Sequence, residues 1–154
     1  MRTVTLLLLA PAGARGQSAP GRVCPDPARP CPGFQPHDLS FRLPADGTAR
    51  EENRSAPFYA VVLRTAPRCS LDERERLAAQ ALFPDRKVFA TRFECEGDVE
   101  NNLTYTGVDA RRGFLAVYAG ETRAQAVEVL ARVRATGRFP CTSVRRMSVV
   151  RVHP

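Results

Sequence analysis

Several residue types are scarce in this 154-residue chain, and their scarcity narrows the chemistry that it can carry. The sequence has no tryptophan, one lysine (Lys87) and two histidines (His37 and His153). None of its five cysteines forms a CxxC pair, so the Cys and His spacing fits no zinc site. A glycine-rich phosphate-binding loop is also missing. We therefore expect neither a metal nor a cofactor.

Catalytic constellations are missing as well. A hydrolase needs paired carboxylates or a nucleophile beside a base. His37 lies in a proline-rich stretch and His153 stands one residue before the last, so neither is well placed as that base. The acidic residues after position 93 lack the spacing of a calcium-binding loop, and we interpret them as a solvated turn: Glu94, Glu96, Asp98 and Glu100. The sequence therefore predicts a protein that is not an enzyme.

Long hydrophobic runs are a third absence. A bilayer-spanning helix needs about 20 predominantly apolar residues, and no segment approaches that length. The short apolar run 4–10 follows Arg2 and precedes the small-x-small sequence at 14–16, which is the pattern of a signal peptide. We expect residues 1–16 to be cleaved and the remainder to reach the periplasm or cell envelope, with no membrane span. The alternative is a disordered N-terminus.

The charge balance narrows the class of partner. The formal charge is +7, and the basic surplus is spread along the chain. In an exported protein such a surplus meets anionic envelope polymers or lipids more often than nucleic acid. The aromatic signature of RNA-binding modules is also absent. We expect no nucleic-acid partner, and the alternative to an envelope partner is a solvated basic surface.

Residues 17–56 are predicted to form a proline-rich linker or a wrapping arm. Seven prolines between Pro20 and Pro44 preclude a helix or a central strand through most of this stretch. Residues 39–43 alternate apolar and polar side chains, as an added edge strand would.

Two copies of a strand-and-helix plan follow the arm. Residues 58–65 and 114–119 are apolar strands. After each strand comes a capping box, Ser70 to Glu73 in the first copy and Thr122 to Gln125 in the second. In the second helix the residues at helical spacing are Val127, Leu130 and either Val133 or Arg134, and Gly137 ends it.

Two further strands, at 87–95 and 141–152, complete the pattern. The order β-α-β-β-α-β predicts an α+β, ferredoxin-like domain: a four-stranded antiparallel sheet in strand order 4-1-3-2, with two helices on one face. The polar segment 96–112 is long for a hairpin, and it is either a functional loop or a tolerated insertion.

The cysteines of an exported chain predict disulfides. Cys24 and Cys31 are close enough in sequence to close a small loop. The predicted sheet gathers Cys69, Cys95 and Cys141 at one end. Adjacent strands would favour Cys69 with Cys141, whereas flexible chain ends would favour Cys69 with Cys95. We favour the second pairing, which leaves Cys141 unpaired.

Residues 57–154 resemble the SPOR (sporulation-related repeat) domain of bacterial envelope proteins. The resemblance rests on FYAVVLRT, LAAQALFP, KVFATRF and, most specifically, FLAVYAGETRAQAVEVLARVRATG. It implies a two-repeat fold that binds peptidoglycan glycan strands stripped of their stem peptides, without catalysis. Val61 stands where the family commonly has glutamine. The alternative is therefore an exported structural or protein-interaction domain that kept the fold, lost glycan binding and contacts another envelope protein.

The sheet face away from the helices is where we expect a ligand. Alternation places Tyr59, Val61, Leu63 and Thr65 there from the first strand, and Phe114, Ala116 and Tyr118 from the third. An apolar face of that size is seldom bare, so either it binds a ligand or the arm 24–56 covers it. The candidate sugar-binding residues are aromatic or apolar groups for sugar faces and arginines for muramic carboxylates: Tyr59, Val61, Arg64, Arg92 and Tyr118.

Overall fold

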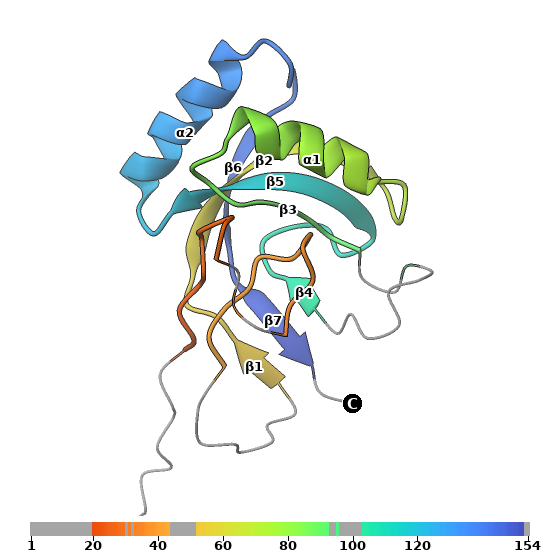
Figure 1. Cartoon of the computed structure of the whole chain (residues 1–154), viewed down its shortest axis with the longest axis vertical. Coiled ribbons are helices and arrows are strands. Elements are labelled where there is room, and N and C mark those ends of the chain that lie inside the picture. Colours follow the sequence, from red (N-terminus) through yellow and green to blue (C-terminus); the bar gives the residue numbers. More distant parts are fainter. Residues whose placement is uncertain are drawn as a thin grey trace, which may run out of the picture.

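Figure 1 shows a computed structural model of the chain, which describes residues 20–29, 31, 33–43, 52–92, 95 and 103–152. This part of the chain is an α+β structure with two helices and two antiparallel sheets, of four and three strands. The predicted signal peptide, the acidic residues 94–100 and His153 lie outside the described residues.

The larger sheet contains β2 (Phe58–Pro67), β3 (Val88–Ala90), β5 (Arg112–Gly120) and β6 (Ser143–Met147). Its neighbours run β3-β5-β2-β6, and every pair is antiparallel. The two central strands are apolar on both faces because each face is covered. All of β5 is buried except its first residue.

Helices α1 (Glu73–Leu82) and α2 (Arg123–Ala135) pack against the same face of this sheet (Figure 1). Both contribute to one apolar cluster with the strands beneath them, which includes Ala79, Val88, Leu115, Val117, Ala126, Val129 and Val133. Of the stripe predicted for α2, Val133 is buried in this cluster and Leu130 packs partly against it, but Val127 is 56% exposed and was wrongly included.

The two helix starts differ from each other. The capping box of α2 is confirmed: the backbone N–H of Gln125 donates to Thr122 Oγ1, and the Gln125 side chain accepts from the N–H of Thr122. The predicted box of α1 was wrong, because Asp72 is the N-cap and its carboxylate accepts from the N–H of Arg74. The hydroxyl of Ser70 donates instead to the carbonyl oxygen of Pro67, 2.8 Å away.

The strand predicted at 141–152 is interrupted at Ser148, and its second part leaves the larger sheet. There β7 (Val149–Val152) pairs with β1 (Glu52–Arg54) and β4 (Leu103–Tyr105) in the order β1-β7-β4. Two hydroxyls replace ladder bonds at the break: Ser148 N–H donates to Thr106 Oγ1 and Val149 N–H to Ser55 Oγ. A single continuous strand was therefore the wrong prediction here.

Strand β3 is an edge strand whose outward backbone groups are capped by side chains of α1. The N–H of Val88 donates to Gln80 Oε1 at 2.9 Å, and Arg76 Nη1 donates to the Val88 carbonyl at 3.2 Å. Glu73 binds the same guanidinium through three hydrogen bonds of 2.6 to 2.9 Å. This capping explains why Arg76 is only 5% exposed, and it blocks further pairing at this edge.

Arg76→Met should lower the free energy of unfolding by about 1–3 kcal/mol, since the buried Val88 carbonyl loses its donor while the apolar stem is kept. Urea denaturation followed by circular dichroism measures this change. Arg74→Met is the matched control, because Arg74 is an exposed arginine on the same helix, and its effect should stay within about 0.5 kcal/mol. Equal effects of the two substitutions would contradict the capping role.

Candidate functional site

The residues that β2 presents on the side away from the helices are not the ones that alternation predicted. Phe58, Ala60 and Val62 lie there and pack with Phe114 and Tyr118. The residues predicted for this side pack on the helix side instead: Tyr59, Val61 and Leu63.

A β-bulge explains the error. The register of β2 against β5 shifts between Val62 and Arg64, so Leu63 is an extra residue on β2. Strict alternation along β2 correctly places Thr65, which lies after the bulge, on the side away from the helices. Before the bulge, the extra residue reverses the assignment of every side chain.

The five predicted sugar-binding residues do not meet at one surface. Tyr59 and Val61 pack toward the helices, and Arg64 forms an ion pair of 2.5 Å with a glutamate of α1. Tyr118 lies on the opposite side of the sheet and is 8% exposed. Its buried surroundings raise the pKa of its hydroxyl. Arg92 follows the end of β3. These positions therefore do not assemble the predicted sugar site.

The arm, meaning the described residues between Pro20 and Leu43, covers much of the sheet face away from the helices. Leu39 and Phe41 are at most 1% exposed and belong to the apolar cluster on that face. Leu103 and Tyr105 of the smaller sheet join the same cluster. In Figure 1 the arm and the smaller sheet both lie on the side opposite the two helices. The arm is thus part of the core rather than a linker.

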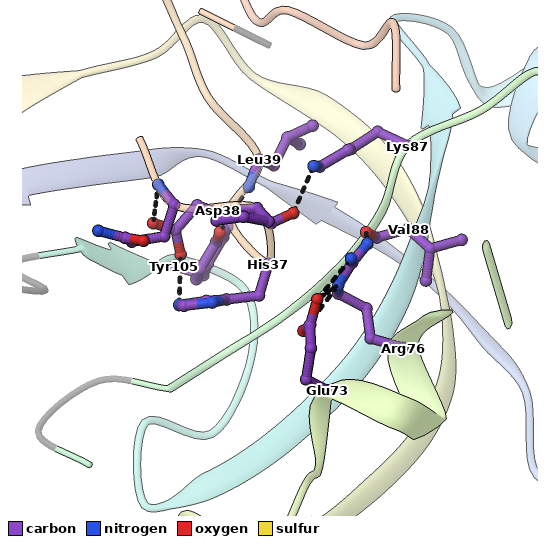
Figure 2. Close-up of polar contacts among 10 residues, drawn as sticks. His37, Asp38, Leu39, Glu73, Arg76, Lys87, Val88 and Tyr105 are labelled. Carbon is purple, nitrogen blue, oxygen red and sulfur yellow. Dashed lines mark hydrogen bonds and ion pairs between the residues drawn. The ribbon is translucent and has the colours of Figure 1, made fainter. Parts of the chain in front are cut away.

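Buried polar groups fasten the arm to the domain (Figure 2). Lys87 Nζ donates to the carbonyl oxygen of Pro36 at 2.5 Å, and the N–H of Leu39 donates to Tyr105 Oη at 3.1 Å. His37 Nε2 lies 3.5 Å from Asp38 Oδ1. Because all of these side chains are almost fully buried, we interpret the group as an anchor for the arm and not as a site that meets a ligand.

Burial shifts the pKa values of Lys87 and Tyr105 in opposite directions. It lowers the pKa of Lys87 below its usual 10.5, and the nearby guanidinium of Arg76 adds to this shift. It raises the pKa of Tyr105 well above its usual 10.0, with a further contribution from Asp38. In both cases the interior favours the uncharged form.

Two disulfides are present, Cys24–Cys31 within the arm and Cys69–Cys95, and these are the pairs that we favoured. The second joins the segment after β2 to the segment after β3. Cys141 is exposed and free. In the described part of the chain, no three His, Cys, Asp or Glu residues gather as metal ligands would. Neither α1 nor α2 is long and apolar enough to cross a membrane.

Two cavities remain open beside the turn between β4 and β5, and we call them together the turn site. One has a volume of about 360 Å³ and includes Val62, Thr65, Ser143 and Arg145 in its lining. The other has a volume of about 340 Å³ and is lined in part by Arg68, Thr91, Tyr105 and Arg111. Four residues line both cavities: Val108, Asp109, Arg112 and Phe114.

The turn site combines an apolar floor with cationic walls. Val62 and Phe114 are buried and form part of the floor, whereas Arg112 and Arg145 are exposed. Asp109 is the single carboxylate among the described lining residues. The backbone N–H and the guanidinium of Arg111 hold the pKa of Asp109 below its usual value. An apolar floor with arginine walls suits a ligand that has both apolar faces and negative charge.

Sequence reasoning singled out the segment 96–112 but none of the arginines around the turn site. The local signal was the pair Arg111-Arg112 next to Gly113, where a turn meets a strand. Arg145 lies on β6, and β6 lies beside the turn site because it pairs with β2. That contact depends on sheet pairing and has no local signal.

The chain was compared with protein-family models, curated proteins and solved structures, and none of them matches it. The resemblance to the SPOR domain therefore stays a prediction.

Phe41→Ala should lower the free energy of unfolding by about 3–5 kcal/mol, because it opens a cavity between the arm and the larger sheet. Leu43→Ala, at a position of the same arm that is 36% exposed, is the control and should cost less than about 1 kcal/mol. Both values come from urea denaturation with the disulfides intact. A small effect of Phe41→Ala would mean that the arm is only a linker.

In the unaltered chain Lys87 should make the free energy of unfolding increase as the pH rises into the alkaline range, and Lys87→Met should abolish this increase. Because the folded pKa of Lys87 is below 10.5, the unfolded chain binds more protons between the folded pKa and pH 10.5. The free energy of unfolding therefore increases with pH across that window in the unaltered chain.

Tyr105 acts in the opposite direction, since its raised pKa makes stability fall as the pH rises above about 10.0. Lys87→Met keeps this contribution, so the difference between the two proteins isolates Lys87. Urea denaturation from neutral pH to pH 10.5 measures it. Parallel pH profiles of the two proteins would contradict a lowered pKa of Lys87.

Proposed function

We propose that the chain is an exported, non-catalytic binding module of the bacterial cell envelope that recognises peptidoglycan glycan strands. The observation that carries this proposal is the turn site, where an apolar floor and exposed arginines stay open while the arm covers the neighbouring sheet face. Carbohydrate recognition needs apolar surface for sugar faces and polar donors for hydroxyls, and bacterial glycan also carries carboxylates.

The arrangement of the sheet supports a SPOR-like, ferredoxin-like topology as part of the same proposal. If β2, β3, β5 and β6 are numbered one to four, the neighbour order β3-β5-β2-β6 corresponds to the proposed order 4-1-3-2. Both helices pack on one face, as this topology requires. The smaller sheet and the arm are additions to the plan.

Export is supported by the two disulfides, because such bonds persist in oxidising compartments. The periplasm or cell envelope is the compartment in which a glycan partner would be met. The proposed signal peptide at 1–16 would direct the chain there.

A second candidate function is a structural or protein-interaction domain that kept the fold and lost glycan binding. The observation that favours it is the burial of Tyr118 and of the face around it by the arm and the smaller sheet. A module that bound glycan through that face would need it open. Because that face is covered, glycan binding requires the turn site.

The disulfide-intact chain, without residues 1–16, should pellet with purified sacculi that an amidase has stripped of stem peptides. It should pellet less with untreated sacculi, because there the muramic carboxyl groups are tied up in amides. The measurement is the fraction of protein in the pellet after centrifugation, with insoluble chitin as the control for non-specific adsorption. Equal and negligible pelleting with both sacculi would sink the glycan proposal and leave the second candidate.

A further inference from the structure

We propose that the turn site binds a free carboxylate of the glycan, with Arg112 and Arg145 as the residues that recognise it. This inference rests on the proposed function for the identity of the ligand. It assigns recognition to the turn between β4 and β5, at the margin of the sheet face that the arm covers.

The two cavities of the turn site form one extended surface because they share a wall. Val108, Asp109 and Arg112 belong to this wall, and Phe114 lies at its base. A chain of sugars laid along the surface would therefore contact both cavities. A single small anion would need only one of them.

The position of the turn is fixed by its own bonds. Gly107 has a φ of 78°, and a side chain there would collide with the carbonyl oxygen of Arg146. The N–H of Thr106 donates to the carbonyl oxygen of Ser148 at 3.0 Å. The turn that leads to Arg112 is thus held at Gly107 against Arg146 of β6, the strand that carries Arg145.

The two arginines are available for an external anion. Neither Arg112 nor Arg145 forms an ion pair or a side-chain hydrogen bond with any residue in the described part of the chain. Asp109 is already bound by Arg111, whose backbone N–H lies 2.9 Å and whose Nε lies 3.4 Å from Asp109 Oδ1. A guanidinium pairs with a carboxylate through two parallel hydrogen bonds, which gives geometric selectivity as well as affinity.

The ligand chemistry follows from how peptidoglycan is built. In intact strands the lactyl carboxyl group of each muramic acid is bound to the stem peptide as an amide. Hydrolysis of that amide leaves one free carboxylate on each disaccharide of the strand. Two arginines beside an apolar floor would therefore distinguish stripped strands from intact ones by the carboxylate that lies next to the sugar ring. An oligosaccharide of N-acetylglucosamine offers similar sugar faces without any carboxylate.

Calorimetric titration of the disulfide-intact chain with peptide-free muramic oligosaccharides tests this assignment. Arg112→Gln and Arg145→Gln should each weaken binding about 10-fold or more, since each removes a charge-assisted pair. Arg112→Lys should keep part of the affinity. Arg134→Gln, at an exposed arginine of α2 outside the turn site, is the matched control and should bind like the unaltered chain. N-acetylglucosamine oligosaccharides of the same length should bind more weakly than the muramic ones.

The outcomes separate this inference from the proposed function. If the unaltered chain binds the muramic oligosaccharides and both glutamine variants bind equally well, the inference is overturned and the proposed function stands. Equal affinity for the two oligosaccharides would also overturn it, because the carboxylate would then play no part. If the unaltered chain binds neither oligosaccharide nor stripped sacculi, the inference and the proposed function fail together.

Discussion

The outward backbone groups of β3 are the constraint on which the rest of the structure depends. A buried edge strand must find partners for its N–H and C=O groups, because each unpaired group would cost about 1–3 kcal/mol. Gln80 and Arg76 of α1 serve Val88, and the carbonyl oxygen of His37 accepts from the N–H of Ala90 at 2.9 Å. The same few bonds therefore fix the helix on one side of the edge and the arm on the other.

The proline content of the arm suits it to this role. A proline has no N–H to leave unsatisfied, yet its carbonyl and the one before it remain acceptors. The carbonyl oxygen of Pro25 accepts from the N–H of Lys87 at 3.1 Å, and that of Pro36 accepts from the ammonium group of the same residue. A segment that cannot form a regular strand thus satisfies donors at the sheet edge. The composition that suggested a linker is equally suited to a closely packed cover.

Local patterns in the sequence predicted the elements whose causes are local. The capping box at Thr122 and the Cys24–Cys31 disulfide are examples, because short-range hydrogen bonding and chain proximity decide them. The errors in the sheet arose where a distant residue decides the outcome. The bulge at Leu63 depends on pairing with β5, and the break at Ser148 depends on hydroxyls brought in from other segments. The turn site was missed for the same reason, since Arg145 joins it only through the pairing of β6 with β2.

The consequence for function is that one fold can carry its recognition surface in different places. The sheet face that the resemblance pointed to is occupied by Leu39 and Phe41, so its apolar area contributes to stability rather than to binding. Closing that face makes the turn between β4 and β5 the boundary between covered and open sheet. At such a boundary an apolar floor lies next to solvent-exposed arginines, and that combination suits the anionic sugar that we propose as the ligand. Function here must accordingly be argued from Arg112, Arg145 and their surroundings, because the layers of the fold are compatible with either proposed role.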